Sequence, residues 1–246
     1  MSRFAKLLVQ KKDDLYGCKP VTVAFLGDSV TQGCFEVYPV GETALETIYD
    51  VQSAYSTKFR QLLATVCPKA PVNIVNAGIS GGGAPNGLER LERDVLAYHP
   101  DLAVVCFGLN DCTRGMEHIG EYTDALTGIF VRLREEGVET VFMTPNMVSD
   151  SVSWHIQEPR FKELAAMLAG IQKGGTLDSY MDAAREAAAK CGVRVCDCYS
   201  RWRKLNRLGI DTTDLLSNYL NHPTRDMHWL FANALFETLF YDEETI

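Results

Sequence analysis

Four residues whose types suit acyl transfer are spread along the chain. Ser29 follows the first short apolar run, and Gly78 and Asn110 follow the second and third. His222 stands just before the last helical stretch. A serine hydroxyl becomes a nucleophile when a base such as histidine takes its proton. The negative charge that then develops on the attacked carbonyl oxygen needs hydrogen-bond donors, and the N–H groups of Ser29 and Gly78 and the side-chain amide of Asn110 can supply them.

These residues can act together only if the fold brings them to one place. Five short apolar runs alternate with stretches of helical periodicity, which is typical of a parallel sheet covered by helices on both faces. Ligands of such sheets bind beyond the carboxyl ends of the strands, where Ser29, Gly78 and Asn110 stand. The predicted strands are Val21–Leu26, Val72–Asn76, Leu102–Phe107, Glu139–Thr144 and Val193–Asp197.

Two further segments complete the predicted organisation, in which residues 1–246 form a single domain. Residues 1–20 carry Phe4, Leu7 and Leu8 at helical spacing and predict a short helical extension laid over the domain. Residues 34–51 show no helical stripe and predict a long loop after the first strand. Long loops of α/β proteins usually lie at the functional edge, so this loop is a candidate for covering the site.

The motifs around the four residues resemble a known family. Gly27-Asp28-Ser29, Gly78, Gly108-Leu109-Asn110-Asp111 and His222-Pro223 resemble, in this order, the four sequence blocks of the SGNH hydrolases, also called GDSL esterases and lipases. The resemblance implies a flavodoxin-like three-layer α/β/α sandwich with a five-stranded parallel sheet. It also implies ester hydrolysis, with Ser29 as nucleophile and His222 as base. The family includes carbohydrate deacetylases, and we expect a small acyl ester as substrate, with acetyl on a carbohydrate as the preferred candidate.

One position departs from the family pattern. The family usually has an acid three residues before the catalytic histidine, and here that residue is Tyr219. Taking His228 as the base does not restore the pattern, because Arg225 stands three residues before it. Either a backbone carbonyl orients His222, or an acid comes from elsewhere. The candidates for that acid are Asp197, Asp214 and Asp226.

The composition narrows the class of partner. The chain has 246 residues, of which 46% are hydrophobic and 23% charged, and its net charge is −8. An acidic chain has no electrostatic reason to bind nucleic acid or an anionic membrane surface, so we expect a small-molecule ester as partner. No apolar run approaches the ~20 residues of a membrane span, and no export signal is seen, which predicts a cytoplasmic protein. The oligomeric state is left open.

The eight cysteines predict neither disulfides nor a metal site. They are scattered along the chain without a CxxC pair, and in a reducing compartment they are mostly buried small hydrophobes. Cys196 and Cys198 form the only close pair, without further ligands at metal-binding spacing. We therefore expect no metal and no cofactor.

Two alternatives to an active esterase follow from the same residues. The missing acid is compatible with a catalytically impaired relative that binds carbohydrate. A flavodoxin-type module would instead hold the phosphate of FMN near Ser29, Thr31 and Gln32, and it would need a helix directly after that turn to supply N–H groups.

Overall fold

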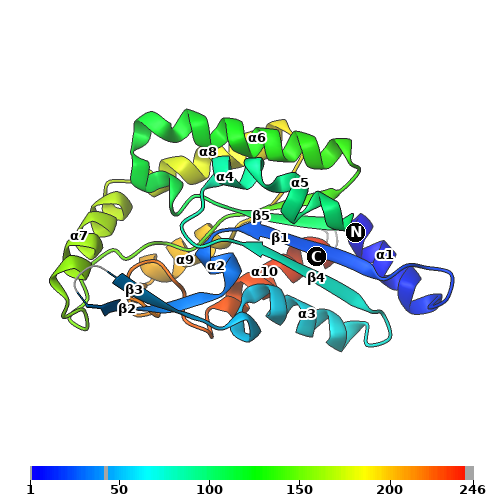
Figure 1. Cartoon of the computed structure of the whole chain (residues 1–246), viewed down its shortest axis with the longest axis horizontal. Helices are drawn as coiled ribbons and strands as arrows, with labels where there is room; N and C mark the ends of the chain where they lie inside the picture. Colours follow the sequence, from blue (N-terminus) through cyan, green and yellow to red (C-terminus); the bar gives the residue numbers. More distant parts are fainter. Residues whose placement is uncertain (1, 42–43, 242–246) are drawn as a thin grey trace.

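The five apolar runs form one parallel sheet in the computed structural model, which describes residues 2–41 and 44–241 (Figure 1). Its strands follow the spatial order β4–β1–β5–β6–β7, which is the flavodoxin-like order. Every residue of β5 is buried, as expected for a central strand covered on both faces. The predicted fold class is confirmed. The strands are β1 (Val21–Gly27), β4 (Val72–Gly78), β5 (Leu102–Cys106), β6 (Glu139–Met143) and β7 (Arg194–Cys196).

Helices cover both faces of this sheet. In Figure 1, α4, α5, α6 and α8 lie above the sheet, whereas α3 and α10 lie below it. Buried aromatic rings such as Phe25, Tyr55 and Phe59 pack edge to face between β1 and α3. The helices are α1 (Arg3–Asp13), α2 (Ser29–Gln32), α3 (Tyr55–Val66), α4 (Ala84–Glu89), α5 (Leu91–Asp94), α6 (Ile119–Glu135), α7 (Pro159–Lys173), α8 (Thr176–Lys190), α9 (Cys198–Arg207) and α10 (His228–Phe240), with short 3₁₀ turns at Val51–Ser53, Leu96–Tyr98, Asp111–Arg114 and Met116–His118.

The N-terminal extension contains the expected helix. Helix α1 buries Phe4 and Leu8 and packs against β1 and α10. The Ser2 hydroxyl caps it by accepting a hydrogen bond from the Ala5 N–H, which satisfies one of the unpaired donors of the first turn. Residue 1 of the predicted extension lies outside the described residues.

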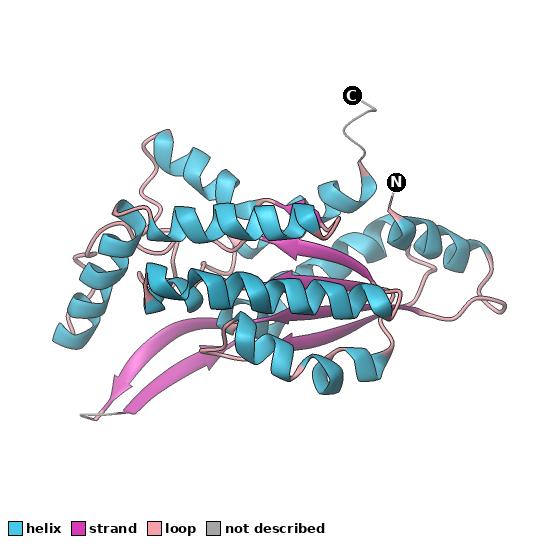
Figure 2. Ribbon diagram, turned by 90° about the horizontal axis from the view of Figure 1, so that it is seen from above, coloured by secondary structure: helices cyan, strands magenta, loops and turns pink. Residues whose placement is uncertain are grey.

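The segment 34–51 is not the long loop that the sequence predicted. It forms an antiparallel hairpin of β2 (Cys34–Val40) and β3 (Ala44–Tyr49), and residues 42–43 lie outside the described part. Figure 2 shows this hairpin extending away from the main sheet. The outer half of the hairpin is exposed on both faces. The alternation of apolar and polar residues that usually reveals a strand is therefore weak here.

Candidate active site

Ser29 is the first residue of the short helix α2, two residues after β1 ends. The Asp28 carboxylate caps this helix by accepting a hydrogen bond from the Val30 N–H at 2.9 Å. The helix ends at Gly33, whose φ of 94° is in the left-handed region that glycine adopts without strain. This tight turn leaves Ser29 buried, with 3% of its surface exposed, at the carboxyl edge of the sheet.

His222 contacts the serine directly. Its Nε2 atom lies 3.0 Å from Ser29 Oγ. The loop that carries His222 is held by the Asn218 side chain, whose Oδ1 accepts hydrogen bonds from the N–H groups of Leu220, Asn221 and His222, each at 3.0 Å. Asn146 donates to the Asn221 carbonyl at 2.8 Å and ties the same loop to the segment after β6. These hydrogen bonds hold the His222 loop in place beside Ser29.

The other ring nitrogen of His222 meets a backbone carbonyl. Nδ1 lies 2.8 Å from the Phe35 oxygen. A carbonyl oxygen can only accept a hydrogen bond, so Nδ1 carries the proton and Nε2 of the neutral ring presents its lone pair to Ser29. Burial lowers the pKa of His222 below its usual 6.5, and the Phe35 hydrogen bond and the nearby Glu36 charge oppose this shift. The ring is thus neutral at pH 7 and able to accept a proton.

The structure brings none of the three candidate acids to the His222 ring. Asp197 caps α9 through the Ser200 N–H and pairs with Arg185 at 3.0 Å. Asp214 and Asp226 are exposed. Within the described part of the chain, the partners of the ring are the Ser29 hydroxyl and the Phe35 carbonyl. The Nδ1 atom of His222 is therefore bound by a backbone carbonyl of the hairpin and not by a carboxylate.

Gly78 does not present its N–H to the site. That group donates to Asn76 Oδ1 at 3.0 Å. A Cβ atom at position 78 would lie 2.2 Å from the Gln32 backbone nitrogen, so the missing side chain allows α2 to pack closely on β4. Gly78 therefore lets the helix that carries Ser29 pack against β4, and this differs from the donor role expected from the sequence.

Gly81 and Asn110 both keep hydrogens that are available for donation. The Gly81 N–H makes no hydrogen bond within the described residues. The Asn110 amide donates one hydrogen to the Gly82 carbonyl at 2.9 Å, which ties it to the glycine turn and leaves its second hydrogen available. Both residues line a cavity of about 430 Å³. The run of three glycines was the only sequence signal for Gly81.

Two buried carboxyl groups adjoin the site residues in sequence. Burial raises the pKa of Asp28 to about 7, and the nearby charge of Asp111 adds to this shift. Burial also raises the pKa of Asp111 to about 6. Asp111 Oδ1 accepts a hydrogen bond from the Ala84 N–H at 2.9 Å and so links the Asn110 turn to the start of α4.

His228 serves the core rather than the serine. It is fully buried on α10, and its Nδ1 accepts a hydrogen bond from the Tyr55 N–H at 3.0 Å. Burial lowers the pKa of His228 to about 3, so the ring is neutral at all ordinary pH values.

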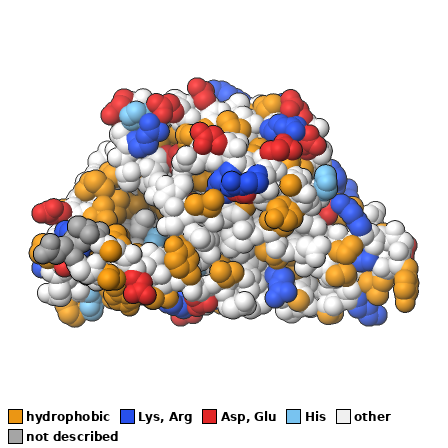
Figure 3. Space-filling model, viewed as in Figure 1, with side chains coloured by type: hydrophobic (Ala, Val, Ile, Leu, Met, Phe, Trp, Pro, Cys, Tyr) orange, Lys and Arg blue, Asp and Glu red, His pale blue; other side chains and the backbone are white. Residues whose placement is uncertain are grey.

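Three aromatic rings contact one another where the segment after β6 meets the His222 loop. The Tyr219 ring stacks on the His155 ring with 4.8 Å between centroids and an angle of 11°. The Trp154 ring lies 3.6 Å from the His155 ring and is 77% exposed. Figure 3 shows hydrophobic side chains gathered on the left of the molecule, where Figure 1 places α7 and the hairpin. The exposed Trp154 is thus connected through His155 to Tyr219, which lies three residues before His222.

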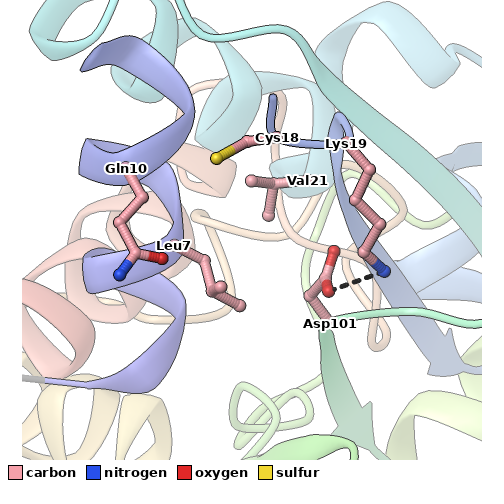
Figure 4. Close-up of a pocket in the computed structure, with 6 residues that line it drawn as sticks. All are labelled: Leu7, Gln10, Cys18, Lys19, Val21 and Asp101. Atoms are coloured by element: carbon pink, nitrogen blue, oxygen red, sulfur yellow. Dashed lines mark ion pairs between the residues drawn. The ribbon is translucent and has the colours of Figure 1, made fainter. Parts of the chain in front are cut away.

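A second cavity lies at the opposite edge of the sheet, and none of the candidate site residues lines it. It measures about 210 Å³ and is lined by residues of α1 and of the amino ends of β1 and β5, including Val21 and Asp101 (Figure 4). Lys19 Nζ pairs there with Asp101 Oδ1 at 3.0 Å. Among the residues that line this cavity, none forms a contact between a nucleophile and a base like that of Ser29 and His222.

The described ranges contain neither a cluster of metal-binding side chains nor a membrane-spanning helix. No three His, Cys, Asp or Glu side chains of residues 2–41 and 44–241 are grouped so that they could hold a metal ion. None of the helices in these ranges combines the length and hydropathy that crossing a bilayer requires.

Several known proteins are similar to this chain. An acetylxylan esterase from Geobacillus stearothermophilus is 29% identical over 130 residues. This match covers 49% of the chain and spans only 58% of the length of that relative. The solved structure of the acetylxylan esterase Axe2 from the same organism superposes with a TM-score of 0.66 at 22% identity, over 90% of this chain and 95% of that one. The acetyl xylan esterase AlAXEase gives a TM-score of 0.65 at 19% identity, over 89% and 100% of the two chains.

The sequence profile of one family covers most of the chain. The GDSL-like lipase/acylhydrolase family matches residues 25–230, a stretch that includes Ser29, Gly81, Asn110 and His222. The solved structures share the fold, and the profile adds the sequence pattern of the family. The chain therefore belongs to the GDSL-like lipase/acylhydrolase family, as its motifs predicted.

Proposed function

We propose that the protein is a serine esterase that removes a small acyl group, with acetyl on a carbohydrate as the preferred substrate. The observation that carries the proposal is the 3.0 Å contact between Ser29 Oγ and His222 Nε2, in a chain whose family consists of acylhydrolases. A nucleophile held on a neutral base is the arrangement that acyl transfer requires.

In the proposed reaction, Ser29 Oγ attacks the ester carbonyl and His222 Nε2 takes the hydroxyl proton. The proton that Nδ1 already carries stays on Nδ1 and remains hydrogen-bonded to the Phe35 carbonyl, which orients the ring and stabilises the imidazolium without a carboxylate charge. The imidazolium then protonates the departing alcohol and leaves an acyl group on Ser29. A water molecule, deprotonated by the same Nε2, releases the acid and restores the serine.

The oxyanion hole that we propose consists of Ser29, Gly81 and Asn110. The Ser29 N–H makes no hydrogen bond within the described residues, and it belongs to the attacking residue. Gly81 takes the place first expected for Gly78, because the Gly78 N–H is already bound to Asn76. Donors of this kind contribute on the order of 10²–10³ in rate each.

The choice of an acetylated carbohydrate rests on two observations. The relatives named above are acetylxylan esterases, and the cluster of Trp154, His155 and Tyr219 offers an exposed aromatic surface at Trp154. The face of an aromatic ring is electron-rich and attracts the weakly positive C–H bonds of a sugar ring. We propose that this surface receives the sugar to which the acyl group is attached.

A comparison of Ser29→Ala with a matched serine variant tests the proposed activity. We expect Ser29→Ala to lose ~10⁴-fold or more in kcat on p-nitrophenyl acetate, and a fluorophosphonate to label Ser29 in the unchanged protein. Ser179→Ala, on α8, is the control and should retain full activity. A series of p-nitrophenyl esters from C2 to C12 should show the highest kcat/KM at C2.

Acetate release, fluorophosphonate labelling and the colour of the purified protein distinguish the esterase from its alternatives. An impaired carbohydrate-binding relative would bind acetylated xylooligosaccharides without releasing acetate, and it would leave the fluorophosphonate unreacted. A flavin-binding module would be yellow when purified. Labelling at a serine other than Ser29, or unchanged turnover in Ser29→Ala, would contradict the mechanism.

A further inference from the structure

The acceptor of the His222 Nδ1 proton belongs to the hairpin and not to the central sheet. The strand pairing of the hairpin shifts register between Cys34 and Val37, so Phe35 and Glu36 lie in an irregular stretch of β2. A bulge of this kind takes residues out of the regular ladder and lets them point elsewhere. The carbonyl that orients the proposed base therefore depends on contacts other than strand pairing.

Arg225 supplies such contacts, three residues after His222. Its two terminal nitrogens bind both Glu36 carboxylate oxygens, at 2.5 and 3.0 Å. Its Nε donates to Asp50 at 3.0 Å, and its guanidinium lies 4.4 Å from the centroid of the Phe35 ring. One side chain thus contacts Phe35 itself, the residue after it and the residue that follows β3.

The Arg225 network also reaches Ser29, through Asp50 and two backbone hydrogen bonds. The Asp50 N–H donates to the Gly33 carbonyl at 2.8 Å, and the Gly33 N–H donates to the Ser29 carbonyl at 3.1 Å. Arg225 is consequently joined to the base along the chain and to the nucleophile through Asp50. Both carboxylates are charged at neutral pH, since Arg225 holds the pKa of Glu36 below its usual range and Ser53 does the same for Asp50, with help from Arg225.

We propose that Arg225 is a positioning residue for the reaction: by holding Glu36, Asp50 and the Phe35 ring, it keeps the Phe35 carbonyl on His222 Nδ1. This role rests on the proposed function. The side chains of Arg225, Glu36 and Asp50 are 37%, 26% and 30% exposed, and ion pairs this close to solvent stabilise a fold little. The network therefore acts mainly through geometry. A planar fork that binds a carboxylate through two parallel bonds is a property of arginine that lysine lacks.

The test compares Arg225→Gln and Arg225→Lys with Arg201→Lys. Arg201 forms an ion pair with Glu237 between α9 and α10 at similar exposure, and its variant should match the unchanged protein. On p-nitrophenyl acetate we expect both Arg225 variants to lose about 10- to 100-fold in kcat with little change in KM. A purely structural role would lower the melting temperature and leave the kcat of the folded fraction unchanged, which would overturn the proposal.

A second readout does not depend on activity. The proton on His222 Nδ1 should give a low-field NMR signal that is absent in His222→Gln. We expect it to disappear through faster exchange in both Arg225 variants and to persist in Arg201→Lys. Persistence in Arg225→Gln together with unchanged kcat would overturn the proposal. If the unchanged protein hydrolyses no ester, the proposed function fails, and the NMR comparison still tests the positioning role.

Glu36→Gln covers the case in which the Arg225 variants do not fold. It keeps the shape of the side chain and removes the charge that Arg225 binds. Glu36 is the charged group that raises the pKa of His222 against the effect of burial, and Glu36 in turn pairs with Arg225. Glu36→Gln should weaken the Nδ1 signal and lower kcat in the same direction, and an unchanged signal with unchanged kcat would reject the positioning role.

Discussion

The protonation of His222 follows from its two partners. Because the Phe35 carbonyl holds the proton on Nδ1, the nitrogen that faces Ser29 is free to accept one. Burial favours the neutral ring, as it does for any group that loses hydration on charging. In the proposed mechanism, His222 would act as the base without a carboxylate partner, and so without the strong negative charge that a triad aspartate places beside the imidazolium.

The pH dependence of the reaction should reflect this environment. The base must be neutral, and its pKa is lowered, so the acid limb of kcat/KM on p-nitrophenyl acetate should have its midpoint below pH 6.5. Activity measured from pH 4 to 8 checks this. Asp28, whose pKa is about 7, and Asp111, whose pKa is about 6, also titrate in this range, and Asp28 directly precedes the serine. In Asp28→Asn, the midpoint of the acid limb of kcat/KM should be unchanged. Loss of the acid limb in this variant would show that Asp28, and not His222, is the titrating group.

The elements around the site position it through close backbone contacts. Helix α2 packs on the end of β4 because Gly78 has no side chain, and β1 pairs there with β4 at Gly27 and Gly78. The Gln32 side chain at the end of α2 accepts a hydrogen bond from the Ser80 N–H at 2.7 Å. Helix α2, which carries Ser29, and the turn that carries Gly81 are consequently connected to each other.

Gly78→Ala should disturb this unit. The added Cβ would meet the Gln32 backbone at 2.2 Å, so α2 must move, and we expect a loss of about 1–3 kcal/mol in the free energy of unfolding together with a lower kcat. Gly170→Ala is the control, since a Cβ on that exposed helical position meets nothing within 4 Å. It should stabilise the protein by up to ~1 kcal/mol. Urea unfolding and kcat give both quantities, and a neutral Gly78→Ala would show that α2 is not held here.

The loop after β6 and the His222 loop form the surface proposed for the sugar. Trp154→Ala should raise KM for acetylated xylooligosaccharides by roughly 3- to 10-fold and leave KM for p-nitrophenyl acetate unchanged, because the small ester does not reach the stack. Tyr98→Ala, an exposed aromatic residue before β5, is the matched control. Equal changes on both substrates would indicate a general distortion of the site.

For the molecule as a whole, buried titratable groups make the stability depend on pH in opposite directions. The folded pKa of His228 is about 3, so below pH 6.5 the unfolded chain binds a proton that the folded protein does not. Its contribution is lost as the pH falls from 6.5 towards 3. Asp28, with a folded pKa raised to about 7, favours the folded state below pH 3.8 and loses this contribution as the pH rises through 7.

His228→Gln should separate these two effects. The glutamine oxygen can still accept the Tyr55 N–H, but no group at this position titrates. Between pH 6.5 and 3 we expect the unfolding free energy of the variant to fall less steeply than that of the unchanged protein, by at most about 1.4 kcal/mol per pH unit. Denaturant unfolding at several pH values checks this, and parallel curves would show that His228 does not contribute to the acid sensitivity.

Much of the architecture could be predicted from the order of the residues. The central strands are buried on both faces and appear as unbroken apolar runs, and the motifs around Ser29, Asn110 and His222 indicated the family. The hairpin β2–β3 was not predicted, because its exposed outer half lacks the alternation of apolar and polar residues that indicates a strand. Its inner end, which meets His222, has no composition that would distinguish it from a loop.

The details of the site depended on the folded chain, for a physical reason. Every residue carries a carbonyl and nearly every residue an N–H, so a backbone acceptor such as Phe35 has no signature in residue type. Whether a given N–H is free also depends on distant neighbours, and Asn76 occupies that of Gly78 while Gly81 keeps its own. The chemistry of the side chains can be predicted from the sequence. The direction and availability of backbone groups are decided only when strands, turns and ion pairs such as Arg225–Glu36 pack together.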